Sequence, residues 1–132
     1  MKAISAKMTH GIQVGSYLKC ADNSGATLLK VISVKKYKGV SRRLPRTGVG
    51  GWVVCTVKKG DPKMKHEVVN AVIIRQRREY RRKNGMRIKF EDNAAVLINE
   101  KGDVKATRIK GPVAKEAVER FSTIGKIATM VV

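Results

Sequence analysis

The stretch from Asn70 to Leu97 constrains the fold of this chain most, because two apolar runs flank a short, strongly charged segment. Residues 71–74 are all apolar, which is typical of a strand buried on both faces or of a barrel strand. Residues 94–98 form a second such run. Between them lies Asn84-Gly85, the strongest short-range hairpin signal, because both central residues of a type I′ turn need positive φ. The stretch therefore predicts a hairpin over residues 75–92 that projects from two buried strands.

The predicted hairpin is strongly basic, with eight Lys or Arg residues against Glu79 in residues 75–89. An ideal two-residue turn would set three cross-strand pairs: Arg82 with Arg87, Arg78 with Glu91, and Arg77 with Asp92. Like charges directly opposite each other destabilise a sheet by roughly 0.2 to 1 kcal/mol, so the tip suits a polyanion better than free solution. Arms of six or seven residues would reach about 20 Å. The alternative is a solvated hairpin whose charges only prevent edge-to-edge aggregation.

Length and charge limit the class of protein. A chain of 132 residues fits one domain, 1–132, with one modest core. A net charge of +19 favours nucleic acid or an anionic membrane as partner. Residues 1–90 hold 22 basic and 4 acidic side chains, whereas residues 91–132 hold 7 and 6. We therefore expect the first two-thirds to meet the anion and the last third to meet another partner. No apolar stretch is long enough for a signal peptide or a membrane span, so we expect a soluble cytoplasmic protein with no membrane contact.

Catalytic and metal-binding patterns are absent from the sequence. Cys20 and Cys55 lie in apolar runs without Cys-x-x-Cys spacing, so we expect buried thiols in a reducing compartment, no metal and no cofactor. His10 and His66 have no nucleophile in a recognisable arrangement. The nearest approaches to a pair of catalytic carboxylates are Glu91 with Asp92, which have hairpin partners, and Glu116 with Glu119, which fit a helix surface. We expect no enzyme.

Turn signals at short intervals divide the chain into short strands. We predict strands over residues 17–21, 26–36, 52–57, 67–74 and 94–98, and a further short one over 105–110. Pro112 suits the first turn of a helical region over residues 112–128. Residues 1–16 show little periodicity and read as a loosely ordered N-terminal extension. Together these features predict a mainly β fold: a small closed five-stranded β-barrel with a projecting basic β-hairpin and one or two short C-terminal helices.

Two further basic segments accompany the hairpin. Residues 35–47 hold six basic residues and no acid, and residues 58–65 form a lysine-rich turn. A loop so basic repels itself unless phosphates neutralise it. Trp52 beside valines is more typical of core than of a stacking platform, and Tyr80 is the main candidate for stacking on a base. The candidate RNA-binding residues are Lys35, Lys36, Lys38, Arg42, Arg43, Arg46, Lys58, Lys59, Lys63, Lys65, Arg75, Arg77, Arg78, Tyr80, Arg81, Arg82, Lys83, Arg87 and Lys89.

Several motifs together resemble a known family. They are Ala21-Asp22-Asn23-Ser24-Gly25-Ala26, the apolar run 71–74, Asn84-Gly85, Phe90, Asn93, Val96-Leu97 and Gly111-Pro112-Val113. From Gly15 onward the chain is similar to the universal family of large-subunit ribosomal protein fourteen, in its archaeal and eukaryotic form. The extension before Gly15 departs from the shorter bacterial pattern.

The resemblance implies a structural constituent of the large ribosomal subunit that binds large-subunit rRNA on the face that meets the small subunit. It further implies contacts with neighbouring large-subunit ribosomal proteins, with small-subunit rRNA at an intersubunit bridge, and with an anti-association factor near the C-terminal region. The residues that match this partner region are Thr107, Arg108, Val113 and Lys115.

Two other functions compete with this interpretation. A single-stranded nucleic-acid chaperone or translation factor on a small barrel would stack bases on exposed aromatics, and only Tyr80 and then Tyr37 are candidates. Such a factor would leave the large subunit in a moderate-salt wash, whereas a ribosomal protein would stay. An RNA-processing enzyme would lose activity on mutation of His66 or Glu91 while keeping its affinity for RNA.

Overall fold

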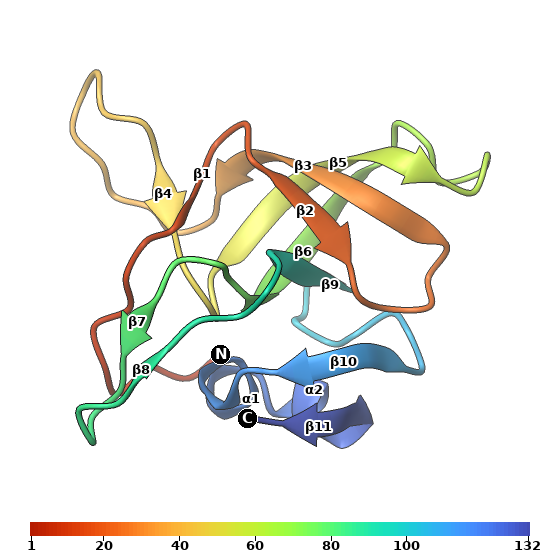
Figure 1. The fold of residues 1–132 in the computed structure, drawn as a ribbon. Helices are drawn as coiled ribbons and strands as arrows, with labels where there is room; N and C mark the ends of the chain where they lie inside the picture. The colour runs from red at the N-terminus through yellow and green to blue at the C-terminus, as the bar shows by residue number, and fades with distance from the viewer.

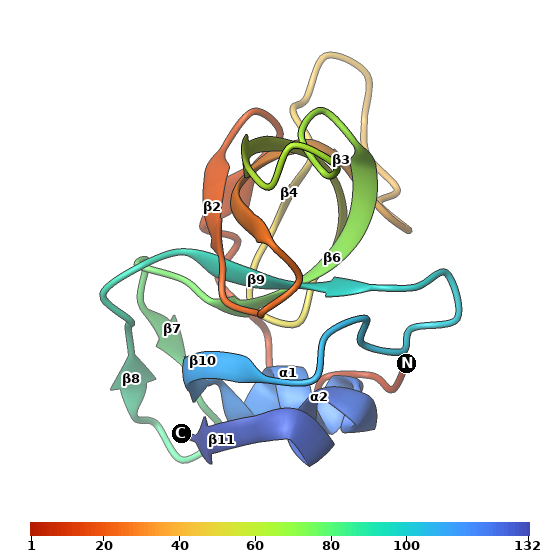
Figure 2. The ribbon, with the colours of Figure 1, turned by 90° about the vertical axis from the view of Figure 1, so that its right-hand side faces the viewer.

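Five strands close into a barrel, and a thinner layer of two helices and two strands covers one side of it (Figures 1 and 2). The computed structural model describes residues 1–132. The barrel strands are β2 (Tyr17–Cys20), β3 (Ala26–Val34), β5 (Trp52–Gly60), β6 (Val68–Arg75) and β9 (Ala94–Ile98). Neighbours pair antiparallel except β2 and β9, which pair in parallel and close the ring. The predicted barrel and its five strands are confirmed.

Buried and partly exposed side chains alternate along the strands, as expected for a closed barrel with an apolar interior. In β5, Val53, Cys55 and Val57 are fully buried, while the residues between them are partly exposed. They meet Leu18, Leu29 and others in one of two apolar cores, which fills the ring seen end-on in Figure 2. Burial raises the pKa of the Cys55 thiol to about 12. Both cysteines are free, so this core depends on aliphatic packing alone.

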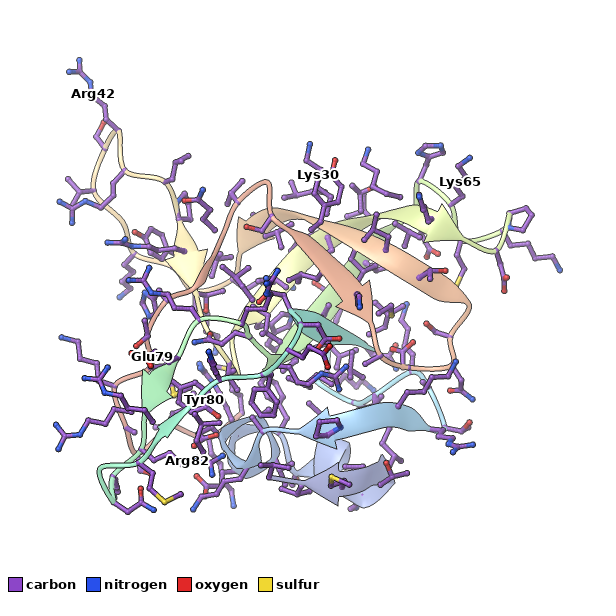
Figure 3. The ribbon with its side chains drawn as sticks, viewed as in Figure 1. Lys30, Arg42, Lys65, Glu79, Tyr80 and Arg82 are labelled. Atoms are coloured by element: carbon purple, nitrogen blue, oxygen red, sulfur yellow. The ribbon has the colours of Figure 1, made fainter.

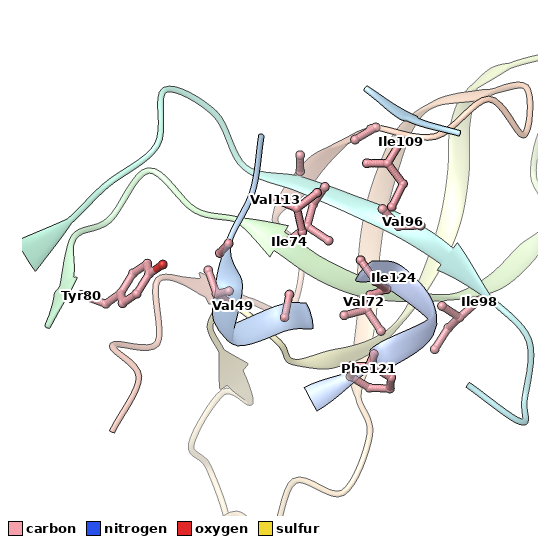
Figure 4. Packing of buried hydrophobic residues seen from close by; sticks show 14 residues of the cluster. Val49, Val72, Ile74, Tyr80, Val96, Ile98, Ile109, Val113, Phe121 and Ile124 are labelled. Atoms are coloured by element: carbon pink, nitrogen blue, oxygen red, sulfur yellow. The ribbon is translucent and has the colours of Figure 1, made fainter. Parts of the chain in front are cut away.

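The second core lies between the barrel and the C-terminal layer (Figure 4). It joins Val72, Ile74 and Val96 of β6 and β9 to Phe121 and Ile124 of the helices. The layer consists of β10 (Ile109–Val113), α1 (Lys115–Arg120), α2 (Ser122–Ile127) and β11 (Ala128–Val131). The predicted pair of short helices is confirmed, and neither is long or apolar enough to cross a membrane.

The start of the C-terminal layer differs from the prediction. The strand begins at Ile109 rather than Lys105, and Pro112 lies within it rather than at the start of a helix. The preceding Gly111 has φ +78°, and a residue before proline disfavours the helical region. The apolar C-terminal tail supplies the partner strand, because β11 pairs with β10 in parallel at Pro112 and Val113. This pairing carries the strand past Gly111 to Pro112 and Val113, where a helix was predicted.

The N-terminal segment is part of the domain, contrary to the prediction of a loose extension. β1 (Ile12–Gln13) pairs with β4 (Arg46–Thr47). Ile12 is only 1% exposed and belongs to the barrel core. Near the N-terminus, the Lys2 N–H donates to the Arg120 carbonyl at 3.0 Å. One apolar side chain, Ile12, is too short a pattern to predict from sequence that the N-terminal segment packs against the barrel.

The hairpin has a different turn from the one predicted. β7 (Tyr80–Arg81) and β8 (Arg87–Ile88) pair with Arg81 opposite Arg87, one position away from the ideal two-residue register. Gly85 has φ +85°, and its N–H donates to the Arg82 carbonyl at 3.0 Å. Asn84 has no positive φ; its side chain accepts from the Met86 N–H at 3.0 Å. The loop is a three-residue type I turn with a glycine bulge, so Arg82 no longer faces Arg87.

Candidate nucleic-acid interface

Most of the predicted RNA-binding side chains are exposed, and they extend over several sides of the barrel (Figure 3). Arg42 marks the tip of the loop between β3 and β4, and Lys65 marks the turn between β5 and β6. Lys58 and Arg82 are half-buried. The exposed members are Lys35, Lys36, Lys38, Arg42, Arg43, Arg46, Lys59, Lys63, Lys65, Arg77, Arg78, Arg81, Lys83, Arg87 and Lys89.

The hairpin is fixed to α1 by a buried polar cluster. Glu116 is 4% exposed and accepts hydrogen bonds from the Tyr80 hydroxyl at 2.9 Å and from Arg82 Nε at 2.6 Å. Arg82 also donates to the Val132 carbonyl at 2.6 Å. Burial lowers the pKa of Arg82, but its hydrogen bonds and the charge of Glu116 more than offset that effect and raise it overall. The helix thus holds the hairpin through one carboxylate.

Two predictions about this cluster are wrong. Tyr80 is 1% exposed, so its ring packs in the second core and cannot stack on a base (Figure 4). Burial and the hydrogen bond to Glu116 raise its pKa, which keeps the hydroxyl a donor. Glu116 lies inside the protein rather than on a helix surface, because it satisfies Tyr80 and Arg82 at once.

Arg75 is also an internal residue. It is 8% exposed, and its Nε donates to Asp92 Oδ1 at 2.8 Å. The same guanidinium donates to the carbonyls of Lys110 at 3.1 Å and Pro112 at 2.7 Å. The bond to Asp92 joins the two ends of the hairpin, and the other two join the hairpin to β10. The prediction that Arg75 contacts RNA is therefore wrong, and the predicted partner of Asp92, Arg77, remains exposed without an ion pair.

A basic hollow lies where three separate segments meet. Its volume is about 230 Å³, and its lining includes Lys7 and His10 from the N-terminal segment, Arg46 from β4 and Arg78 from the hairpin. Arg46 and Arg78 belong to different predicted basic segments, and the structure brings them to one site. Lys7 and His10 were not predicted as site residues. Their signal in sequence was weak, because nothing indicated that the N-terminal segment docks here.

The buried side chain of Gln76 joins the segments that line this hollow. It is fully buried; its Nε2 donates to the carbonyls of Thr9 at 3.0 Å and Arg78 at 2.9 Å, and its Oε1 accepts from the Val49 N–H at 3.1 Å. Gln76 was not among the predicted site residues. The sequence signal for Gln76 was its uncharged amide, which directly follows the buried run 71–75. A polar group buried at that position needs hydrogen-bond partners from other segments.

The long basic loop, residues 35–47, stands away from the barrel. Lys36 and Arg42 have positive φ values of 60° and 65°. Lys35 Nζ lies 4.9 Å from the centroid of the Trp52 ring, which is itself partly buried against Phe121 as the sequence suggested. None of the loop's cations forms an ion pair. The loop therefore offers unneutralised charge to a partner.

The predicted protein-partner residues are only partly available. Thr107 and Arg108 are exposed, and both backbone N–H groups donate to Asn23 Oδ1, at 3.2 and 3.3 Å. Lys115 is exposed at the start of α1. Val113 is fully buried in the second core, so the prediction that it contacts a partner is wrong. Its place in β10 turns its side chain to the core.

The structure shows no group of three or more His, Cys, Asp or Glu side chains that could hold a metal ion. The acidic pair Glu91 and Asp92 is divided, because Asp92 binds Arg75 while Glu91 is exposed. What the surface offers is cationic charge on a rigid barrel, together with shallow polar hollows. Such a surface binds polyanions.

Comparisons with known proteins identify the family. Residues 11–132 match the model of ribosomal protein L14p/L23e. The chain is 52% identical to large ribosomal subunit protein uL14 of Methanothrix thermoacetophila and 48% identical to that of Methanocorpusculum labreanum. It is 51% identical to that of Halorubrum lacusprofundi, and each of the three matches covers all of both chains. The chain therefore belongs to the ribosomal protein L14p/L23e family, and it is a structural, non-enzymatic constituent of the large subunit of the cytoplasmic ribosome.

Proposed function

We propose that the protein binds large-subunit rRNA through its hairpin, its long basic loop and its lysine-rich turn. The observation that carries this proposal is the lack of internal neutralisation: among the exposed cations of these segments, only Arg87 forms an ion pair, with Glu79 at 2.8 Å. A surface of unpaired like charges is unfavourable unless counter-ions or phosphates neutralise it. Membership of a ribosomal protein family supports rRNA as this polyanion.

The barrel acts as a spacer between RNA segments. Hydrogen bonds to Glu116 and Gln76 fix the hairpin and its base, so Arg78, Arg81 and Lys83 approach phosphates from set positions. Guanidinium groups suit this role, because they bind phosphate oxygens through two hydrogen bonds and also stack on bases. Ordering before binding reduces the entropy lost on association.

The affinity of the protein for large-subunit rRNA should depend steeply on salt. If about six to ten phosphates are contacted, the affinity should fall by about 10³ to 10⁵ between 50 and 200 mM monovalent salt. Filter binding or fluorescence anisotropy over that range measures the slope. Affinity that stays constant with salt would contradict phosphate binding.

We further propose that the C-terminal layer contacts proteins and the small subunit. Residues 91–132 are close to neutral, and the whole C-terminal layer lies within them. Just before this layer, Asn23 holds Thr107 and Arg108 in one orientation, with its Nδ2 donating to Thr107 Oγ1 at 2.9 Å. The expected partners are neighbouring large-subunit proteins, small-subunit rRNA at a bridge, and an anti-association factor. The support for this assignment is the charge asymmetry and the resemblance of this segment to the family.

Replacing Arg108 with Glu should weaken subunit joining without preventing incorporation into the large subunit. A charge reversal at the rim of an interface should reduce the association rate, here on the order of tenfold. Stopped-flow light scattering of purified subunits measures that rate. The matched control is Lys126→Glu, at an exposed lysine of α2. Equal joining rates for the two variants would remove Arg108 from the bridge.

A further inference from the structure

An open hollow of about 280 Å³ lies beside β2, at the base of the basic hairpin. Its lining includes Tyr17 and Lys19 of β2, Leu28 of β3, Arg77 and Glu91 of the hairpin, and Asn93 just after the hairpin. The hollow therefore combines an aromatic ring, an aliphatic side chain, cations and the carboxylate of Glu91, which has no ion-pair partner.

The ring of Tyr17 offers a stacking surface. The residue is 53% exposed, although tyrosine has a large apolar face, and Leu28 lies half-buried beside it in the same hollow. Lys30, paired with Tyr17 across the two strands, places Nζ 5.7 Å from the ring centroid. Exposed aromatic rings among cations are typical platforms for the bases of single-stranded nucleic acid.

The polar side of the hollow favours one base. Asn93 is held in place because its Oδ1 accepts from the Arg77 N–H at 2.8 Å. Asp92 is occupied by Arg75, whereas the exposed Glu91 side chain forms neither an ion pair nor a hydrogen bond. An ionised carboxylate only accepts hydrogen bonds. Guanine is the base that presents two adjacent donors, N1–H and N2–H, on its Watson–Crick edge.

We propose that this hollow binds a single unstacked guanine nucleotide of RNA. The base stacks on Tyr17, its N1–H and N2–H donate to the Glu91 carboxylate, and Arg77 and Lys19 lie beside the phosphates. The inference rests on the proposed RNA-binding function and adds a base-specific contact to a surface that otherwise reads only the backbone.

Titration of the isotope-labelled protein with GMP, IMP and AMP, followed by NMR of the Tyr17 ring and the Asn93 side-chain amide, tests the proposal. IMP keeps the N1–H of guanine and lacks the N2 amino group, and AMP lacks both donors. We expect GMP to bind about tenfold more tightly than AMP, the discrimination of one good bidentate contact, with IMP between them. Equal affinities for the three nucleotides, or shifts that bypass Tyr17, would overturn it. Tighter binding of acetyl-arginine amide than of GMP would overturn it in favour of a protein partner.

Two variants separate stacking from base recognition. Tyr17→Leu should weaken the binding of all three nucleotides. Glu91→Gln should abolish the preference for GMP without weakening the binding of AMP. Glu100→Gln, at an exposed acid outside the hollow, is the matched control and should leave the preference for GMP unchanged. Both test residues are exposed, so the variants should fold as the parent does, which a thermal melt verifies. If nucleotides fail to discriminate while binding to rRNA keeps its steep salt dependence, only this inference is lost. If rRNA binding is flat with salt, the proposed function itself fails.

Discussion

Replacing Glu116 with Ala should lower the free energy of unfolding by about 3 kcal/mol and loosen the hairpin. Breaking a buried ion pair from one side costs roughly 3 to 5 kcal/mol, because the remaining charge stays buried without a partner. Here the residue left behind is Arg82, whose side chain is 12% exposed, together with the Tyr80 hydroxyl. Because Arg82 can turn partly toward water, we expect the low end of that range. Denaturant titration measures the change.

The same variant should show where the loss occurs. Amide hydrogen exchange should accelerate in residues 80–88 and in the C-terminal strand, since Arg82 also donates to the Val132 carbonyl. Exchange within the barrel strands should stay close to that of the parent. Glu119→Ala is the matched control: Glu119 is an exposed acid on the same helix, and its removal should change stability by less than about 0.5 kcal/mol. Similar losses from both variants would show that Glu116 does not anchor the hairpin.

The barrel was predictable because its strands carry strong local signals. The apolar run from Ala71 to Ile74 and the alternation of Val53, Cys55 and Val57 each predict a strand without reference to the rest of the chain. Asn84-Gly85 correctly located the hairpin. The exact turn was not predictable from that pair alone, because the same two residues also fit a three-residue loop with a glycine bulge.

The elements that sequence analysis missed depend on contacts between distant segments. β10 continues through Pro112 and Val113 where it pairs with β11, whereas Pro112 suggested a helix start when taken alone. Ile12 enters the barrel core from a segment without periodicity. Short segments of this kind take their conformation from tertiary packing, which overrides local preference.

The candidate site was predicted from the density of charge along the chain. Charge density could not separate cations that face solvent from cations that form internal hydrogen bonds. Arg75 and Arg82 have internal acceptors, Asp92 and Glu116, that lie 17 and 34 residues away in sequence. Tyr80 likewise has its partner on α1. A buried polar side chain is recognised by its partner, and that pairing is visible only in the fold.

Reversing the exposed charges of the hairpin should have the largest effect on function. The triple variant Arg78→Glu, Arg81→Glu and Arg87→Glu changes side chains that are exposed and that do not take part in the hydrogen bonds to Glu116. It replaces three possible phosphate contacts with three repulsions. Since each phosphate contact contributes to the salt slope by about 0.9, the slope should fall by about 3 along with the affinity.

The matched control reverses the same amount of charge on the opposite part of the chain. The triple variant Lys101→Glu, Lys105→Glu and Lys126→Glu changes three exposed lysines of the near-neutral C-terminal third. Both variants have the same net charge, so general electrostatic attraction to RNA is reduced equally. Any difference between them must therefore come from where the charges lie.

Incorporation of the two triple variants into large subunits, each in competition with the tagged parent protein, is the most direct measurement. Subunits are isolated by sedimentation, and the ratio of variant to parent is read by mass spectrometry. If the hairpin cations hold the protein on rRNA, the hairpin variant should be nearly absent from large subunits while the lysine variant is incorporated as the parent is. Equal incorporation of the two variants would contradict the account.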